Sequence, residues 1–433
     1  MAKPTLPLHA QSATDLARQL SRREISAEQL LRDCLERIAA REPEVQAWSY
    51  LAADAALAHA RVMDRGAVRG LLHGLPIGVK DLFDTADMPT TYGSPIYAGH
   101  RPGSDAAAVA LCREQGAIFP GKTVTTEFAA FNPGKTRNPH RLTHTPGGSS
   151  SGSAAAVADY MVPLAFASQT AASVIRPAAY CGIVGYKPSF GQINRTGIKS
   201  LSDGLDTVGA VGRTVEDVAL LVAAMTGDQA LMQLDMADGA TPRIALCQTH
   251  EWPHADADTQ AAMQHAASVL TQAGLPMPEL RLPASFASLL QAQIEIMGFD
   301  LARSLAWERL THPEKLSASL SAVLQNGLNL PLSQHRANLQ LARSARAMVS
   351  ASFGDVDVIL VPSTTGEAPA TLEQTGNPVF GRVWTLLGLP SVHVPFFTGH
   401  TGMPVGLQVI GRFGDDRRVL QTAKWLMQRL VPL

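Results

Sequence analysis

The sequence predicts an α/β fold, and two observations lead to this prediction. Short apolar runs that are typical of buried strands recur after residue 70, and Ala-rich segments with helical spacing lie between them. The chain is also long and apolar enough to bury a large core, because it has 433 residues, of which 46% are hydrophobic and only 17% are charged. Length alone leaves the number of domains open, and neither an internal repeat nor a Pro/Gly/Ser-rich linker divides the chain.

Two capped helices are predicted within the first 65 residues. Ser12 with Asp15, and Ser26 with Gln29, have the spacing of a helix N-terminus. Apolar residues at helical spacing follow the second cap: Leu30, Leu31, Cys34, Leu35 and Ile38. We therefore expect these N-terminal helices to form a packed amphipathic layer.

The α/β region is expected to begin after residue 69. Strands are predicted at 75–81, 116–123, 162–169 and 182–186, and helices at Asp105–Gln115 and Ser153–Asp159. From 284 to 350 the pattern is helical throughout, which predicts a helical excursion from a continuing α/β domain. A strand at 356–363, a strand at 406–412 and a helix at Arg417–Leu430 are expected to complete the chain.

Charge and composition exclude several classes of function. The 36 Lys and Arg residues nearly balance the 37 Asp and Glu residues, and no run of one sign occurs, so neither nucleic-acid binding nor a polybasic membrane patch is predicted. The chain shows no signal-peptide pattern and no apolar stretch of about 18 residues, so a cytoplasmic location is expected. The four cysteines form no CxxC pair, and the histidines show no HxH or HExxH spacing, so no disulfide framework and no metal site are predicted.

Residues 116–123 match the GxxxxGK[ST] phosphate loop letter for letter. Such a loop leaves a strand and enters a helix, so that the helix N-terminus faces the phosphate. Here a helical stretch precedes Gly116, and residues 117–120 are themselves strand-like. We therefore predict a helix, a turn and a strand here, and no nucleotide site.

Residues 148–152 fit the GxSxG pattern that exposes a nucleophilic serine in α/β-hydrolases. That geometry requires a buried strand before the serine, whereas the preceding residues are polar and contain prolines. No later Asp and His stand out as partners either. Taken alone, this stretch is typical of a flexible Gly/Ser loop.

Two other segments have features that a catalytic site could use. Lys80 lies in a short apolar run, where burial would disfavour its charge and leave an amine able to accept a proton. A lysine that extends to solvent or forms a salt bridge is the structural alternative. Further on, a turn of small residues follows the strand predicted at 162–169, and consecutive N–H groups there could converge on one anionic oxygen. These residues are Thr170, Ala171, Ala172 and Ser173.

The three segments together resemble one known family. They are the GxPxxVKD segment around Lys80, the GGSS loop in PGGSSSGSAAAVA (146–158), and a second serine 24 residues after Ser149, at Ser173, followed by PAAYCGIVGYKPS. This combination resembles the amidase signature family, whose serine hydrolases use a Ser-cisSer-Lys triad. Further segments are similar to that family: TTYGS (90–94), GKTVTTEFA (121–129), RNP (137–139), WTLLGLPSVHVP (384–395) and GMPVGLQVIGR (402–412).

The resemblance covers most of residues 70–415 and implies both a fold and a mechanism. It implies one large α/β/α domain over residues 1–433, with a central mixed sheet and with the 284–350 excursion shaping the substrate mouth. It assigns Ser173 as the nucleophile, Ser149 as the bridging serine and Lys80 as the base. The physical reading agrees, because a serine hydroxyl needs a base and this chain offers no obvious histidine for that task. The N–H groups of Thr170, Ala171, Ala172 and Ser173 would hold the oxyanion.

The turn departs from the family pattern. Where the family has TDxGGSIRxP, this chain has Gln169 in place of the Asp, Ala171 and Ala172 in place of the glycines, and Arg176 one position late. If either glycine position requires a positive φ, alanine there costs roughly 1–2 kcal/mol and could tilt an oxyanion donor. Arg176 is expected to order the turn by hydrogen bonding. The residues expected to support the site are Gly147, Gly148, Gln169 and Arg176.

The function implied by the resemblance is hydrolysis of the C–N bond of a small amide, without a metal or cofactor. Carbamates and esters would also suit such a centre. Two alternatives stay open: a glutamine-hydrolysing subunit of an aminoacyl-tRNA amidotransferase, and a non-catalytic relative whose Ala171–Ala172 turn no longer supports chemistry. A small-molecule substrate is expected and a homodimer is compatible with the sequence. Phe131, Trp307 and Trp384 are candidate pocket residues, although core packing is the more common role for such side chains.

Overall fold

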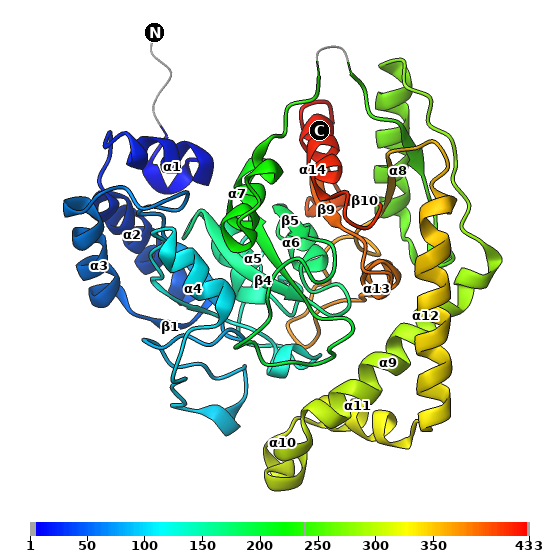
Figure 1. Cartoon of the computed structure of the whole chain (residues 1–433), viewed down its shortest axis with the longest axis horizontal. Coiled ribbons are helices and arrows are strands. Elements are labelled where there is room, and N and C mark those ends of the chain that lie inside the picture. Colours follow the sequence, from blue (N-terminus) through cyan, green and yellow to red (C-terminus); the bar gives the residue numbers. More distant parts are fainter. Residues whose placement is uncertain (1–5, 238–239, 431–433) are drawn as a thin grey trace.

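The computed structural model describes residues 6–237 and 240–430, and one ten-stranded mixed sheet runs through it (Figure 1). The strands, in their order across the sheet, are β1 (Trp48–Leu51), β3 (Gly121–Thr123), β2 (Ile77–Lys80), β4 (Leu164–Gln169), β6 (Thr207–Gly212), β5 (Val184–Lys187), β9 (Ser391–Thr398), β10 (Pro404–Gly411), β8 (Val358–Pro362) and β7 (Ile244–Leu246). The pairs β2–β3, β2–β4 and β7–β8 are parallel and the others are antiparallel. The predicted central mixed sheet is therefore confirmed.

Helices cover the sheet and extend beyond it. They are α1 (Ala13–Ser21), α2 (Ala27–Val45), α3 (Ala53–Arg65), α4 (Ala107–Glu114), α5 (Ser151–Ala158), α6 (Ile175–Tyr180), α7 (Val215–Thr226), α8 (Ala257–Gln272), α9 (Leu289–Ser304), α10 (Ala306–Thr311), α11 (Ala318–Asn329), α12 (Leu332–Ser352), α13 (Val379–Leu386) and α14 (Asp416–Met427). Within the described ranges, none of these helices has a run long and apolar enough to cross a membrane.

The alternating side chains of β4 show why the molecule has three layers. Successive side chains of a strand point to opposite faces of its sheet. Leu164 and Phe166 pack on one face in a core with α4 and α7, whereas Ala165 and Ala167 pack on the other face with α5 and α6. Both faces of this strand are covered, which explains its continuous apolar sequence.

The predicted N-terminal caps are confirmed. The side chain of Ser12 accepts a hydrogen bond from the backbone N–H of Asp15, and Ser26 accepts one from Gln29. The structure adds three elements that the sequence did not predict within this segment: a 3₁₀ helix at Leu8–Ala10, the edge strand β1 and helix α3.

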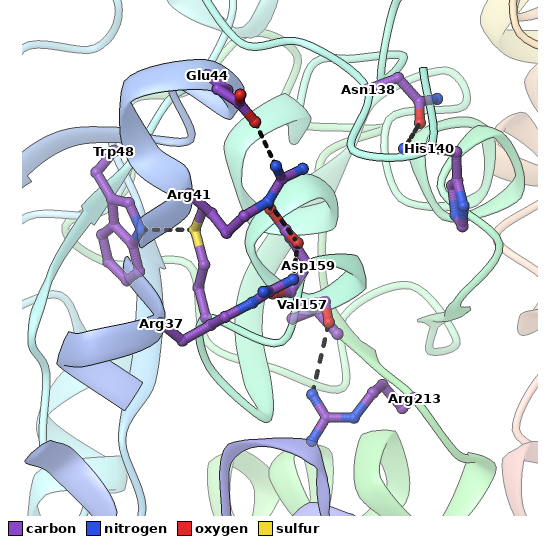
Figure 2. A network of polar contacts seen from close by, with 10 residues as sticks. Arg37, Arg41, Glu44, Trp48, Asn138, His140, Val157, Asp159 and Arg213 are labelled. Atoms are coloured by element: carbon purple, nitrogen blue, oxygen red, sulfur yellow. Dashed lines mark hydrogen bonds and ion pairs between the residues drawn. The ribbon is translucent and has the colours of Figure 1, made fainter. Parts of the chain in front are cut away.

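A cluster of arginines ties α2 to the far end of α5 (Figure 2). Nε of Arg37 donates to the carbonyl of Asp159 at 2.8 Å, and Nε of Arg41 donates to its carboxylate at 2.9 Å. From another side, a guanidinium nitrogen of Arg213 lies 3.5 Å from the carbonyl oxygen of Val157. Because cations beside the last carbonyls of a helix are favourable, these contacts stabilise the end of α5 and fix the helix that begins beside Ser149.

The helical excursion is also confirmed. Helices α9 to α12 form an arm that projects away from the sheet (Figure 1). Gly327 of α11 lies so close to α9 that a Cβ there would stand 1.9 Å from the carbonyl oxygen of Gly298. The base of the arm packs with α13 and with Ile359 and Val361 of β8 in a second core.

One local prediction needs correction. The strand expected at 116–123 is limited to Gly121–Thr123, because Ile118 forms only an isolated bridge with Pro76. The segment after Ser173 forms the short helix α6. Pro177 fits in the first turn of α6, because N–H groups in a first turn have no acceptor within the helix and proline lacks this N–H.

Candidate active site

Lys80 is the last residue of β2, and its side chain is completely buried. Because β2 and β4 are parallel neighbours, their carboxyl ends lie at the same edge of the sheet. Nζ of Lys80 lies 2.8 Å from Oγ of Ser149 and 2.8 Å from Oγ of Ser168. The structure therefore brings together two of the three residues that the resemblance identified.

Burial gives Lys80 an unusual acidity. Removal from water disfavours the ammonium form and lowers the pKa of Lys80 to about 7, while the negative charge of Asp206 acts in the opposite direction. An amine with this pKa is substantially unprotonated at neutral pH. Such an amine can accept a proton from the hydroxyl beside it.

The loop that carries Ser149 is held by its neighbours. The peptide bond between Gly148 and Ser149 is cis. Gly147 has a φ of +80°, and a Cβ there would lie 2.8 Å from Cα of Pro177, so both the backbone and the available space require glycine. The guanidinium of Arg176 donates to the carbonyl of Gly148 at 2.8 Å and 3.3 Å.

Arg176 binds the turn through its backbone N–H, which donates to the carbonyl of Ala172 at 2.8 Å, whereas its guanidinium binds other segments. Its guanidinium bonds to the Gly148 carbonyl, to Oγ1 of Thr375 at 3.1 Å and to the carbonyl of Gly376. It therefore joins the serine loop to the segment before α13, although α6, which carries Arg176, directly follows the turn.

Ser168 is a polar neighbour of Lys80 that sequence reasoning did not select. It precedes Gln169 at the end of β4, and it occupies the threonine position of the family pattern. Its place in the family pattern was the only sign in the sequence that Ser168 could matter. That sign does not reveal a contact with Lys80, which lies 88 positions away in the chain.

The turn after β4 presents a row of backbone donors. Among residues 6–237 and 240–430, the N–H groups of Thr170, Ala171, Ala172 and Ser173 donate to no protein acceptor. Both alanines have negative φ, since neither is among the residues with a positive value. The predicted backbone penalty for replacing glycine by alanine therefore does not arise here.

Gln169 holds this turn in place of the family's aspartate. Its side-chain oxygen accepts hydrogen bonds from the N–H groups of Val174 at 2.9 Å and Ile175 at 3.1 Å. Its amide nitrogen donates to Oγ1 of Thr385 at 2.9 Å, and that hydroxyl donates to the carbonyl of Ala171 at 2.7 Å. A glutamine can thus accept as an aspartate would and also bind α13 to the turn.

Ser173 faces a small cavity of about 20 Å³. Phe131, Met297 and Pro378 form part of its apolar wall, and Thr170 and Ala171 contribute the turn itself. No hydrogen bond from the Ser173 hydroxyl to another side chain occurs in the described part of the chain. A cavity of this volume holds about one water molecule, and the hydroxyl has no side-chain hydrogen bond that a substrate would have to break.

The three candidate aromatic residues have different positions. Phe131 lines the Ser173 cavity, whereas Trp384 is buried in the core between the arm and α13. Trp307 is exposed on α10, where it lies near Tyr97. Of the three, Phe131 has the position expected of a pocket residue.

The lysine of the phosphate-loop pattern has a structural role. Lys122 is buried, and Nζ donates to the carbonyl of Phe83 at 2.6 Å and to Oγ1 of Thr90 at 2.7 Å. It lies on a short strand, and the residues immediately after it form no α-helix. The local geometry is therefore not that of a phosphate loop.

One cluster has the composition of a metal site. Asp258, Glu367 and His400 each offer a ligand atom within 4.8 Å of the others. Asp258 binds Nδ1 of His400 at 2.7 Å, and Glu367 accepts from the N–H groups of Thr401 and Met403 at 3.1 Å and 2.9 Å. The cluster thus holds the turn between β9 and β10.

Comparisons with known proteins point to the same family. A family model described as Amidase matches residues 29–420. Curated relatives include a protein from Synechococcus sp. that is named as a subunit of glutamyl-tRNA(Gln) amidotransferase, with 32% identity over 95% of this chain and 96% of the relative. A protein of the same name from Carboxydothermus hydrogenoformans is 32% identical over 96% of this chain and 97% of its own length.

Solved structures agree in fold over nearly all of the chain. One described as an amidase has a TM-score of 0.88 and 29% identity, covering 97% of this chain and 100% of its own. The peptide amidase of Stenotrophomonas maltophilia has a TM-score of 0.82 and 28% identity, with 98% of both chains covered. Sequence motifs, sheet architecture and family match therefore agree, and the chain belongs to the amidase signature family.

Proposed function

We propose that this chain hydrolyses the C–N bond of an amide through an acyl-enzyme on Ser173. The observation that carries the proposal is the 2.8 Å contact between Ser149 and a buried lysine whose pKa is about 7. The neighbouring turn supports it, because that turn combines a serine hydroxyl with a row of unused backbone donors.

The proposed reaction begins with two proton transfers. Unprotonated Lys80 takes the proton of Ser149, and Ser149 takes the proton of Ser173 as Ser173 attacks the carbonyl carbon of the amide. The negative oxygen that forms is stabilised by the N–H groups of residues 170–173. The relay then runs in reverse and protonates the leaving nitrogen as the C–N bond breaks. A water molecule completes the cycle by hydrolysing the ester on Ser173.

Two functions share this chemistry. The first is hydrolysis of a small amide by the chain alone, and the solved structures named amidase and peptide amidase support it. The second is hydrolysis of glutamine by an amidotransferase subunit that passes ammonia to a partner. The curated relatives support the second function more directly, because those with 32% identity carry that name.

An assay with the purified chain separates the two. Release of ammonia or amine would be measured for L-glutamine, small aliphatic and aryl amides and carbamates, and release of alcohol or phenol for esters, with a chelator present and ATP absent. Turnover of simple amides by the isolated chain supports the first function, whereas turnover of glutamine that depends on added amidotransferase subunits supports the second. Ser173→Ala serves as the matched control and should abolish either activity.

A third outcome would contradict the proposal. If no compound is turned over and a serine-directed phosphonate labels no serine, the chain is a relative without catalytic function.

A further inference from the structure

A second cavity adjoins the one that contains Ser173. It has a volume of about 330 Å³ and lies between α9, α11 and α13. Phe131 and Met297 line both cavities, so the two cavities are neighbours. Its walls are mainly apolar, with Ile294, Val323 and Leu330 on the arm. A group attached to the reacting amide could extend into this space.

Arg382 is the cationic residue that lines this larger cavity. It lies on α13 with only 7% of its surface exposed, and one guanidinium nitrogen donates to the side-chain oxygen of Gln293. No carboxylate lies within ion-pair distance of Arg382 in residues 6–237 and 240–430, and its other guanidinium nitrogens make no hydrogen bond there. Burial without an anion, together with the nearby charge of Arg176, lowers the pKa of Arg382 to about 10, so it remains a cation at neutral pH.

A buried cation without an opposite charge is costly. The partners of the Arg382 guanidinium are neutral: the side-chain oxygen of Gln293 and the ring of Phe131, whose centroid lies 5.9 Å from Cζ. Arg382 also connects to the reacting turn, since Nε2 of Gln293 donates to the carbonyl of Thr170 at 2.8 Å. A planar guanidinium with unused donors matches a carboxylate in geometry as well as in charge.

We propose that this cavity binds a carboxylate of the amide substrate, with Arg382 as its anchor. This inference rests on the proposed amide hydrolysis and adds the substrate class to it. The one other charged residue that lines the cavity in the described part of the chain is Glu295, which accepts hydrogen bonds from Asn338 at 2.6 Å and Gln291 at 2.8 Å. These bonds lower its pKa, so Glu295 stays anionic and the substrate carboxylate belongs at the Arg382 end.

The carboxylate could be carried by either half of the amide, and the substrates of the test distinguish the two. Succinamic and glutaramic acids carry it on the acyl side and are compared with the neutral amides butyramide and valeramide. N-acetylglycine and N-acetyl-β-alanine carry it on the amine side and are compared with N-ethylacetamide. Values of kcat/KM are measured for the wild-type chain, Arg382→Met, Arg382→Lys and Glu295→Gln.

We expect the wild-type chain to prefer the carboxylate-bearing member of at least one pair. Arg382→Met should reduce the ratio of kcat/KM for the charged amide to kcat/KM for the neutral amide about 10- to 100-fold, the range expected for a hydrogen bond between charged groups. Any effect of the variant on the turn, which Arg382 contacts through Gln293, acts on both amides and cancels in this ratio. Arg382→Lys should retain part of the preference, and Glu295→Gln should retain all of it. Equal losses for neutral and charged amides in Arg382→Met, or no preference in the wild-type chain, would overturn the inference.

A binding measurement separates this inference from the proposed chemistry. Titration calorimetry with succinate and glutarate needs no turnover. Binding to the wild-type chain that is lost in Arg382→Met and kept in Glu295→Gln supports the inference even if no amide is hydrolysed. Absence of binding, together with hydrolysis of neutral amides, rejects the carboxylate site and leaves the proposed function intact.

Discussion

A comparison of Lys80 with Lys187 shows that burial alone does not make a lysine a catalytic base. Both side chains are buried, and burial lowers the pKa of each to about 7. Nζ of Lys187 donates to the carbonyls of Leu389 at 2.6 Å and Pro188 at 2.9 Å, which cannot give up a proton. Nζ of Lys80 contacts two hydroxyls instead. The two lysines therefore share a low pKa, but only the amine of Lys80 lies beside hydroxyl groups that can give it a proton.

Activity should depend on pH through Lys80. Because the pKa is lowered from 10.5 to about 7, the amine is protonated and inactive below that value and becomes a base as the pH rises through it. We expect kcat/KM for an amide to rise about tenfold per pH unit below pH 7 and then to level off. The measurement is a pH profile of kcat/KM between pH 5 and 9, within the range in which the chain stays folded.

Substitution of the lysines tests the same assignment. Lys80→Arg and Lys80→Met should be nearly inactive, since a guanidinium stays protonated and a thioether accepts no proton at working pH. Lys187→Met is the matched control: it should lower the melting temperature, while the folded fraction keeps its kcat. Near-normal activity in Lys80→Arg would remove Lys80 from the mechanism.

The two serines should differ in covalent labelling. A serine-directed phosphonate should add its mass to the peptide that contains Ser173 and to no peptide that contains Ser149, as read by mass spectrometry. Ser173→Ala should abolish labelling. Ser149→Ala removes only the relay, so we expect a loss of roughly 10²–10⁴ in rate with slow labelling still detectable. Labelling at Ser149 would reverse the two roles.

The backbone conformation of the 169–173 turn explains why this chain can have alanines where the family has glycines. Ala171 and Ala172 have negative φ, so glycine would bring added freedom in the unfolded chain and no relief of strain. We expect Ala171→Gly and Ala172→Gly to lower the free energy of unfolding by about 0.5–1 kcal/mol each and to leave amide turnover no faster. Urea denaturation and kcat/KM measure both quantities. A gain in turnover would indicate that alanine tilts the oxyanion donors.

The crossing of α9 and α11 offers a matched pair of glycines. At Gly327 a Cβ would lie 1.9 Å from a backbone oxygen, whereas at Gly298 the nearest atom is 3.8 Å away. Gly327→Ala should therefore push the helices apart and destabilise the chain by about 1–3 kcal/mol, whereas Gly298→Ala should be neutral or slightly stabilising. Thermal unfolding of both variants tests this, and equal effects would contradict the close crossing.

The sequence predicts those features whose pattern lies in residues close together along the chain. The caps of α1 and α2, the buried strand β4 and the helical arm all have local patterns, and the structure confirms them. The contact of Lys80 with Ser168 and the hydrogen bond of Gln169 to Thr385 join residues 88 and 216 positions apart, so no local pattern could predict them. The site motifs were recognisable only through family resemblance, because a lone lysine or a Gly/Ser loop is typical of many proteins.

At the scale of the whole molecule, the sheet joins the two halves of the chain. Strands β1 to β6 come from the first half and β7 to β10 from the second, and they meet where β5 pairs with β9. The candidate active site uses both halves as well. Thr385 of α13 binds the turn after β4 directly, and Arg382 of α13 binds it through Gln293. The prediction of one domain over residues 1–433 comes from the family resemblance and stays a prediction, which equilibrium unfolding can test.

Equilibrium unfolding should therefore be a single transition. Trp48 lies in β1 at one edge of the sheet, and Trp384 lies in α13 beside the second half of it. We would prepare two variants that each keep one of these tryptophans and carry phenylalanine at the others, and unfold them in urea. Within each variant, the fluorescence midpoint should coincide with the midpoint from far-ultraviolet circular dichroism, because an interrupted sheet would leave buried strand edges unpaired. Comparison inside one variant cancels any loss of stability caused by the substitutions. If Trp48 reports a midpoint clearly different from that of the circular dichroism, while Trp384 agrees with it, the N-terminal half unfolds as a separate domain and the one-domain prediction is wrong.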